Sequence, residues 1–402
     1  MAAWVGVRPT KPAAIPRRLG SGPAVHVCGN AGPGYMRCMA WKRTDWASPA
    51  IPGGYGPSDL QGAYNLPSGT NGVGQTVAVV DAYDDPKAEA DLGVYRSTFS
   101  LPACTTANGC FLKVNQSGGT SPLPVPDPMP CSGPMGCWEE EEALDIDMVS
   151  ATCPNCHILL VETDSPNNTD LYAGEDAAAT KCGANEISNS WSGGEYSSEA
   201  TDDVHFNRPG IPITVASGDS GYPGGYPAAS QYVTAVGGTT LCTTSNTSGP
   251  CNGTPSETVW KLTGSLCSIY INQPSWQSNS PTVMNNSGVC SMRINNDVSA
   301  VADTATPVAV YTTFGSDHGW LGFGGTSVAT PIIAGVYALA GNGTSIHDGS
   351  YSYSHTSSLH DITSGNNDPC GLPPANNSYV CTAGAGYDGP TGNGTPNGVG
   401  AF

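Results

Sequence analysis

The feature that most constrains the fold is the alternation of short apolar runs with helix-like segments between residues 74 and 341. Runs such as TVAVVD and HILLVE are rich in β-branched and aliphatic residues and end at acids, as buried strands do. Strands that alternate with helices predict an α/β fold, in which helices cover both faces of a parallel sheet. The expected strands are 74–86, 157–162, 185–191, 211–221, 232–238, 297–303 and 308–314, and the expected helices are a short one at Asp59 and Leu60, then 87–99, 138–150, 170–184 and 327–341.

The cysteines indicate an oxidising compartment. Fifteen are too many for a reducing one without a metal-binding pattern, and the CPNC sequence at 153–156 has no second CxxC to complete a zinc site. Close pairs around turn-rich loops predict local disulfides, each stabilising the fold by about 2–3 kcal/mol. The pairs are Cys28/Cys38, Cys104/Cys110, Cys131/Cys137, Cys242/Cys251, Cys267/Cys290, Cys370/Cys381 and, within CPNC, Cys153/Cys156. Cys182 would remain free, and we expect a secreted, disulfide-braced, loop-rich protein.

Charge excludes two classes of partner. Residues 1–50 hold seven of the fourteen basic residues, and the rest of the chain holds 32 of the 33 acids. So acidic a domain repels nucleic acid and anionic lipid at neutral pH, and loses its self-repulsion as carboxylates protonate. We therefore expect a protein suited to acidic conditions, with no nucleic acid and no membrane partner, acting as a monomer. No apolar run is long enough to span a membrane.

The composition divides the chain into two parts. Residues 1–53 are basic and rich in proline and glycine, and they contain no apolar stretch of signal-peptide length. We interpret them as a linker or the remnant of a processed segment. One folded domain is expected over 54–402, with loop-rich insertions at 243–295 and 343–402.

A candidate nucleophile follows the glycines of GFGGTSVATPIIAGVYALAG, where a helix is expected to begin. The hydroxyl of Ser327 would lie beside free backbone N–H groups and the positive end of the helix dipole, which favour a developing oxyanion. An ordinary N-cap is the simpler interpretation of one serine. The full pattern G-T-S-x-x-x-P is more specific.

A candidate base lies in the acid-rich segment WEEEEALDID. Glu141 and Asp145 are four residues apart and share one helical face, although like charges at that spacing destabilise an isolated helix. Near pH 4 a histidine is protonated, whereas a glutamate, with an ordinary pKa of about 4.3, is still partly ionised and can accept a proton. We expect Glu141 to be the base, Asp145 its partner, and Glu139, Glu140 and Glu142 a solvated surface.

Asp219 lies in the tight turn SGDSG after an expected buried strand. A protonated aspartic acid can donate a hydrogen bond to an oxyanion when the pH is low or burial raises its pKa. An Asx-turn residue that caps its own loop is the structural alternative.

The segments EEALD, SGDSG and GGTSVATP occur in the order and rough spacing of the sedolisin (serine-carboxyl) peptidases, so residues 54–402 resemble that family. The resemblance implies a subtilisin-like fold, a serine-type endopeptidase acting on proteins or peptides, and activity at acidic pH. Ser327 would be the nucleophile, Glu141 the base, Asp145 its partner and Asp219 the oxyanion donor. It also implies synthesis with an N-terminal prodomain, which 1–53 is too short to be.

The resemblance extends to a calcium loop formed by HDIT and AGAGYDGPTGNGTP. Two carboxylates and glycine-exposed carbonyls suit one structural Ca²⁺. The ligands implied by the resemblance are Asp361, the carbonyls of Ile362, Gly384 and Gly386, and Asp388.

Weaker candidates and rivals remain open. Asp81, Asp84 and Asp85 end a strand, where a supporting hydrogen-bond role or plain helix capping is expected, and Trp191 lies either in a cleft or in the core. A histidine-dependent subtilase is the enzymatic rival, although none of the seven histidines has the expected H-G-T-H setting. A catalytically inactive, calcium-stabilised binding module of the same fold is the rival from another class.

Overall fold

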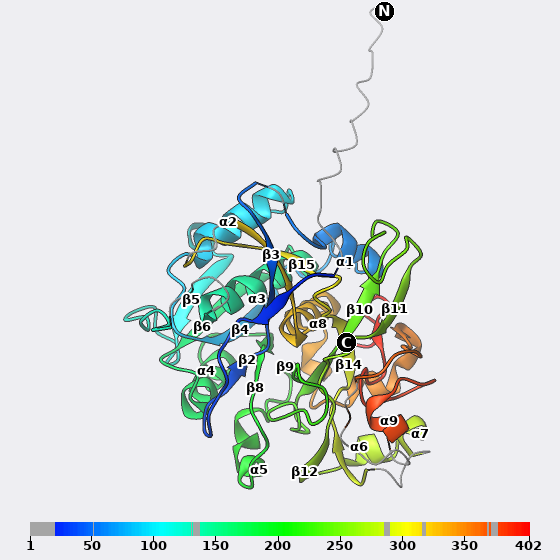
Figure 1. Cartoon of the computed structure of the whole chain (residues 1–402). Helices are drawn as coiled ribbons and strands as arrows, with labels where there is room; N and C mark the ends of the chain where they lie inside the picture. Colours follow the sequence, from blue (N-terminus) through cyan, green and yellow to red (C-terminus); the bar gives the residue numbers. More distant parts are fainter. Residues whose placement is uncertain are drawn as a thin grey trace, which may run out of the picture.

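The computed structural model describes residues 21–50, 52–129, 131, 137–284, 290–315, 319–367, 370 and 377–402. At its centre lies an eight-stranded sheet in the order β11–β10–β9–β7–β4–β6–β5, with β14 paired to β10 (Figure 1). All these pairings are parallel except that of β10 with β11. The strands are β4 (Thr76–Ala82), β5 (Phe111–Asn115), β6 (His157–Thr163), β7 (Glu186–Asn189), β9 (Ile213–Ala216), β10 (Thr234–Cys242), β11 (Ser256–Val259) and β14 (Val298–Val301). The predicted α/β, subtilisin-like sheet is confirmed.

Helices cover both faces because the central strands are apolar on both. Helices α3 (Trp138–Thr152) and α8 (Thr326–Ala340) lie on one face, where Val77 and Val79 of β4 cluster with Ile146. On the other face Val80 of β4 approaches Gly174 of α4 (Asn168–Thr180), and a methyl group at Gly174 would lie 2.9 Å from that valine. Helix α2 (Ala88–Thr98) packs beside α3, and α1 (Pro57–Ala63) also contacts it.

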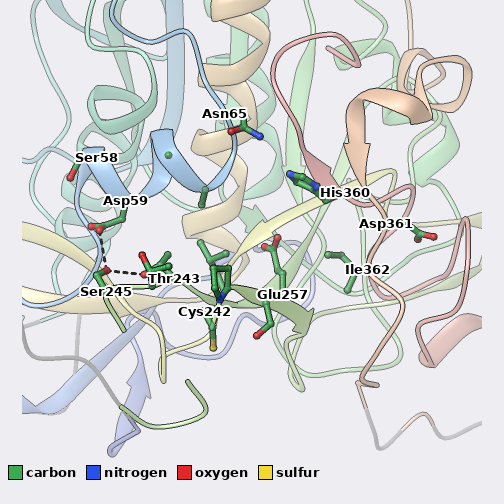
Figure 2. A pocket seen from close by; sticks show the side chains of 16 residues that line it. Ser58, Asp59, Asn65, Cys242, Thr243, Ser245, Glu257, His360, Asp361 and Ile362 are labelled. Atoms are coloured by element: carbon green, nitrogen blue, oxygen red, sulfur yellow. Dashed lines mark hydrogen bonds between the residues drawn. The ribbon is translucent and has the colours of Figure 1, made fainter. Parts of the chain in front are cut away.

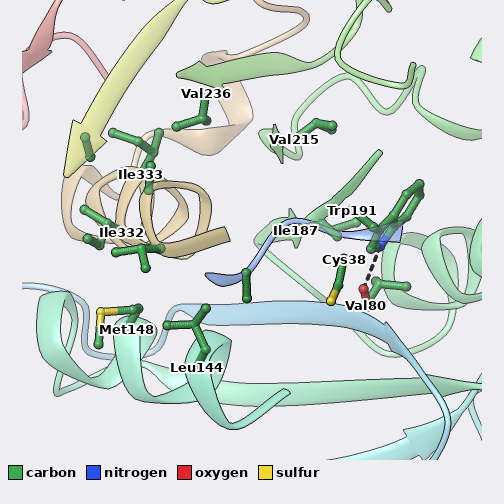
Figure 3. Packing of buried hydrophobic residues seen from close by; sticks show 14 of the residues in the cluster. Cys38, Val80, Leu144, Met148, Ile187, Trp191, Val215, Val236, Ile332 and Ile333 are labelled. Carbon is green, nitrogen blue, oxygen red and sulfur yellow. Dashed lines mark hydrogen bonds between the residues drawn. The ribbon is translucent and has the colours of Figure 1, made fainter. Parts of the chain in front are cut away.

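The contact between α3 and α8 fixes the position of the candidate site. Figure 3 shows Leu144 and Met148 of α3 facing Ile332 and Ile333 of α8. All four side chains are fully buried. Their close packing holds the first turns of the two helices together, and those turns carry Glu141 and Ser327.

A smaller sheet, β1–β3–β16–β15, shows that residues 21–50 are not a linker. Strand β3 pairs with β16, and Lys42 of β3 is 1 % exposed and bonded to Glu140 at 2.8 Å. The linker interpretation of 1–53 is therefore wrong for these described residues, because paired backbone and a buried ion pair outweigh their linker-like composition. The other interpretation, the remnant of a processed segment, stays a prediction. The strands are β1 (Ala24–His26), β3 (Trp41–Ser48), β15 (Val308–Thr312) and β16 (Gly319–Gly324).

The insertions contribute short elements. A two-stranded sheet lies in 243–295 and another joins the C-terminal region, while β2 (Arg37–Cys38) pairs with β8 (Trp191–Ser192). The other elements are α5 (Glu199–Asp202), β12 (Cys267–Asn272), α6 (Ser275–Ser278), α7 (Pro281–Met284), β13 (Met292–Ile294), β17 (Leu359–His360), α9 (Asn377–Cys381) and β18 (Thr395–Pro396).

All seven predicted disulfides are present, and Cys182 is free. Six of the bridges span eleven residues or fewer, and the longest, Cys267–Cys290, spans 23. They therefore brace loops locally and do not join distant parts of the chain. Among the described helices, none is long and apolar enough to cross a membrane.

Candidate active site

Ser327 occupies the first turn of α8, as expected. Gly325 precedes the helix with a φ of 100°, a conformation that favours glycine. The Ser327 hydroxyl donates to the carbonyl of Ser190 at 3.1 Å, and the Ser190 hydroxyl donates to the Ser327 carbonyl at 3.4 Å. Pro331 lies four residues after Ser327 and has no N–H, so the Ser327 carbonyl lacks the usual helical partner and is free to accept from Ser190. The proline of the sequence pattern thus helps to tie the serine to the neighbouring strand.

Glu141 and Asp145 lie on the face of α3 that meets this serine, and both are fully buried. The Ser190 hydroxyl donates to Asp145 Oδ1 at 2.9 Å, whereas neither oxygen of Glu141 accepts a hydrogen bond within the described ranges. Burial raises the pKa of Glu141 well above its usual value, the Asp145 and Asp81 carboxylates raise it further, and the nearby Ser327 hydroxyl lowers it. Burial and then Asp81 raise the pKa of Asp145. These acids share one apolar site, so their protons are coupled.

Asp219 lies on the other side of the serine, in the turn after β9. Its Oδ1 accepts from the Thr326 N–H at 2.9 Å and from the Thr326 hydroxyl at 2.7 Å. Its Oδ2 is buried and has no partner among the described residues. Burial raises the pKa of Asp219 to about 7, against the lowering effect of the Thr326 bonds and of Arg37. Below that pH the carboxyl carries a proton and can donate from the unpartnered oxygen.

Asp81 joins the cluster from the end of β4. It is fully buried, neither of its oxygens is bonded within the described part, and burial raises its pKa to about 8. The expected supporting hydrogen bond is absent among the described residues, and the Asp81 carboxylate, when ionised, raises the pKa of Glu141 and Asp145. Trp191 is a core residue, since its indole is fully buried and donates to the Val80 carbonyl at 2.8 Å.

None of the six histidines in the described part of the chain serves as a base for Ser327. His318 lies outside the described residues, and no hydrogen bond joins any of the other six to the serine. The side chains that shift the pKa of Glu141 are Asp145, Asp81, Ser327 and Asp219. The groups around the hydroxyl are therefore acids, as expected.

The expected solvated face of Glu139, Glu140 and Glu142 is wrong, because all three are buried. Glu140 pairs with Lys42, Glu139 accepts from the Asp127 N–H at 2.8 Å, and Glu142 accepts from the Asp85 N–H at 3.2 Å. The helix is enclosed by strand β3, helix α2 and the loops around β5. These elements cover the sides of α3 that its sequence pattern predicts to be exposed to solvent. Partners distant in sequence are what make this burial tolerable.

Ser190 is a residue that sequence reasoning missed. Its carbonyl accepts from the Ser327 hydroxyl and its own hydroxyl contacts Asp145, so it links nucleophile and acids. The only signal was its place at the end of an expected strand, in SNSWSGG. Serines are common in this chain, and that signal was not specific.

The expected calcium ligands come together at the C-terminal end of the chain. Asp361 Oδ2 accepts from the Gly386 N–H at 2.8 Å, and Asp388 Oδ2 accepts from the Gly384 N–H at 3.1 Å. Burial raises the pKa of Asp388 to about 7, and Asp361 contributes to that rise. Two neighbouring carboxylates beside glycine-rich backbone fit a hard divalent cation. Ile362 is buried beside Asp361.

A cavity of about 690 Å³ adjoins this region and not the serine (Figure 2). Its lining includes Asp59 and Ser245, which are joined by a hydrogen bond, together with His360 and Asp361. A second cavity, of about 350 Å³, is lined by Asp219, Arg37 and Met39. The chemistry described above belongs to the smaller of these two cavities, because its lining includes Asp219, a member of the acid–serine cluster.

Comparison with known proteins gives consistent matches. The subtilase family matches residues 131–353. Kumamolisin from Bacillus sp. (strain MN-32) is 30% identical over 87% of this chain, and sedolisin from Pseudomonas sp. (strain 101) is 28% identical over 84%. The chain spans 63% and 59% of the lengths of these two relatives. A solved structure of Pseudomonas sedolisin, complexed with two molecules of pseudo-iodotyrostatin, is similar with a TM-score of 0.68 and 26% identity. The match covers 87% of this chain and 96% of the sedolisin chain.

Proposed function

Because this chain belongs to the subtilase family, in its sedolisin branch of serine-carboxyl peptidases, we propose that it is an acid-acting endopeptidase that hydrolyses peptide bonds in proteins and peptides. The observation that carries the proposal is the burial of Glu141, Asp145 and Asp219 around Ser327. A solvated acidic helix or an ordinary N-cap serine would not place these groups together. Seven disulfides support secretion into an oxidising compartment.

In the proposed mechanism Ser327 attacks the substrate carbonyl carbon and Glu141 takes the hydroxyl proton. Because its pKa is raised, most Glu141 is protonated at pH 4, and the reacting form is the minority in which Asp145 and Asp81 hold the protons and Glu141 is an ionised, strong base. The oxyanion accepts from the Ser327 N–H and from protonated Asp219. Glu141 then protonates the leaving amine, and water hydrolyses the acyl-enzyme by the reverse sequence.

The pH profile with an unfolded protein substrate tests this mechanism. We expect cleavage at pH 4, less at pH 7.5, and none at either pH with Ser327→Ala. Asp219→Asn should extend activity above pH 7, since an amide donates regardless of pH whereas Asp219, with a pKa of about 7, loses its proton. Activity only near pH 7.5 would contradict Glu141 as base. A folded chain silent at both pH values would favour the inactive binding module.

We also propose that Asp361, Asp388 and the carbonyls of Ile362, Gly384 and Gly386 hold one structural Ca²⁺. The ion would supply positive charge between two carboxylates and tie the C-terminal loop to residue 361. Chelation should lower the free energy of unfolding by about 3 kcal/mol if the ion is present at 100 times its Kd. Asp388→Asn should lose most of that response, and Asp348→Asn, outside the ligand set, should retain it. Equal melting curves with and without chelator would overturn the site. A separate prodomain and a monomeric state stay predictions.

A further inference from the structure

A third cavity, of about 420 Å³, lies apart from the acid–serine cluster. Three segments distant in sequence line it: 200–207 at α5 and the turn that follows, 231–232 just before β10, and 270–274 at the end of β12 and before α6. Figure 1 shows α5, β12 and α6 at the same end of the molecule. Among the described residues, none lines both this cavity and the one beside Asp219. The proposed peptide hydrolysis therefore does not use this site.

The lining of this cavity carries almost no charge. Asp203 is the one acidic or basic residue in the lining that the structure describes, and it is 7 % exposed. Its Oδ1 accepts from the Tyr226 hydroxyl at 3.0 Å, and burial raises the pKa of Asp203, which favours its neutral form at acidic pH. The 690 Å³ cavity, by contrast, is lined by Asp59, Glu257 and Asp361. In a chain of net charge −19, a nearly uncharged cavity favours an uncharged ligand.

The polar groups of the cavity are mainly carboxamides. Four of them line it, those of Asn207, Gln231, Asn272 and Gln273. Within the described ranges no hydrogen bond joins any of these four side chains to the rest of the protein. The nearby Gln277 is different, because its amide nitrogen donates to the Ile294 carbonyl at 2.8 Å. A carboxamide both donates and accepts, so the four unbonded groups suit the hydroxyls of a ligand, each of which also donates and accepts.

The same cavity has flat apolar surfaces. Tyr232 and Tyr270 line it, and Tyr270 is 40 % exposed. Val204 is also in the lining, Ile269 directly precedes Tyr270, and both are among the large apolar side chains that are exposed in the described part. Exposed apolar side chains that gather at a hollow mark an interaction site more often than scattered ones do. Tyrosine rings offer an apolar face with a polar tip, which suits the C–H face of a sugar ring and the hydroxyls around it.

We propose that this cavity binds a neutral oligosaccharide, with the rings of Tyr232 and Tyr270 against its sugar faces and the four carboxamides on its hydroxyls. The cavity volume lies within the range of about 300–1,000 Å³ that is usual for ligand pockets. A peptide is held chiefly by main-chain hydrogen bonds along a strand edge. The groups offered here are side-chain carboxamides and rings, and they favour a sugar. The proposal is independent of peptide hydrolysis, because the cavity and the acid–serine cluster use different residues.

The test uses the full chain carrying Ser327→Ala, which binds without digesting itself or a protein ligand. Isothermal titration calorimetry with neutral oligosaccharides of glucose, xylose, mannose and N-acetylglucosamine should give binding of at least one, at one site per chain, with a Kd of about 1 mM or tighter. The affinity should not change with salt concentration, since no charge pairing is involved. Sedimentation with insoluble cellulose or chitin, and binding to a glycoprotein with and without its glycans, then distinguish a polysaccharide source from a glycoprotein source.

Variants at neighbouring positions separate the cavity from general adsorption. Tyr270→Ala should weaken binding by about tenfold, and Asn272→Ala should also weaken it. Ile269→Ala, the matched control, removes an exposed apolar side chain outside the lining and should bind as the parent does. Circular dichroism checks that each variant is folded.

Three outcomes would overturn the proposal. The first is that no oligosaccharide of the panel binds to the folded chain. The second is that a sugar binds equally well to Tyr270→Ala and to its parent, and the third is that Ile269→Ala weakens binding as much as Tyr270→Ala does. None of these outcomes bears on cleavage of protein by the wild type, so the proposed function is tested separately by its own pH profile.

Discussion

Two sides of helix α3 bury carboxylates in opposite ways. On one side Glu139, Glu140 and Glu142 each have a partner: a backbone N–H for Glu139 and Glu142, and the Lys42 ammonium for Glu140. On the side facing α8, Asp145 accepts from the Ser190 hydroxyl, whereas neither oxygen of Glu141 is bonded within the described part. Both sides have the same residue types and the same burial, so neither property distinguishes them. The two sides differ in whether a hydrogen-bond donor or a cation contacts the carboxylate.

That difference separates structural from chemical carboxylates. A buried acid with a good partner stabilises the fold and is unavailable for other bonds. A buried acid without one costs stability, and such groups cluster where a reaction needs a free acceptor or a shifted pKa. Glu141 belongs to the second kind and Glu140 to the first. The comparison therefore predicts that substituting Glu141 lowers the catalytic rate, whereas substituting Glu140 lowers the stability of the fold.

The largest expected effect is that of Glu141→Gln, which keeps the shape of the side chain and removes the proton acceptor. We expect kcat to fall by about 10²–10⁴-fold with little change in the free energy of unfolding. Single-turnover cleavage of a peptide at pH 4 measures the rate. Glu142→Gln is the matched control, since burial holds the pKa of Glu142 well above its usual value and glutamine imitates its protonated form. If both variants lost the same activity, the distinction between the two sides would be wrong.

Next in size is the effect of Glu140→Ala, which leaves the Lys42 ammonium buried beside a cavity. We expect a loss of about 3–5 kcal/mol in the free energy of unfolding, measured in urea at pH 6, with an unchanged kcat per folded molecule. The double variant Lys42→Met/Glu140→Leu should recover most of the loss, because the buried ammonium is then removed together with its carboxylate partner. A stable Glu140→Ala protein that is nevertheless inactive would place Glu140 in the chemistry.

The last prediction concerns a buried acid away from the serine, whose effect within a single pH unit is the smallest of the three. Glu186 opens β7, is fully buried and has no partner in the described ranges, and burial raises its pKa to about 8. The native state therefore binds one more proton than the unfolded state between about pH 4.3 and 8. Stability should fall by about 1.4 kcal/mol per pH unit as pH rises through that window, then level off.

Glu186→Gln should remove that contribution. Urea unfolding of wild type and variant should agree near pH 4, and the variant should be the more stable at pH 7.5. Asn65→Asp, at an exposed position, would add no such slope. Parallel stability curves for wild type and Glu186→Gln would show that this carboxyl is ionised in the folded protein.

Most of the sheet was predictable because its signals are local. The apolar runs of β4, β6 and β9 and the helical period of α8 each depend on a few consecutive residues. Local disulfides were predictable for the same reason, since close pairs of cysteines such as Cys104 and Cys110 flank one turn. The strands within residues 21–50 were not predicted, because they depend on pairing with β16 and β8, which lie more than a hundred residues away in the sequence.

The sequence by itself determined which residue types the candidate site contains. Ser327, Glu141, Asp145 and Asp219 lie in motifs specific enough to be recognised in the amino-acid sequence alone, and spacing put the two acids of α3 on one face. Only the tertiary structure decided that Asp81 and Ser190 join them, and that the neighbouring glutamates are buried and partnered. The physical reason is that the desolvation and hydrogen bonding of a side chain depend on the residues that surround it in the folded protein. Many of those residues belong to segments distant in the sequence.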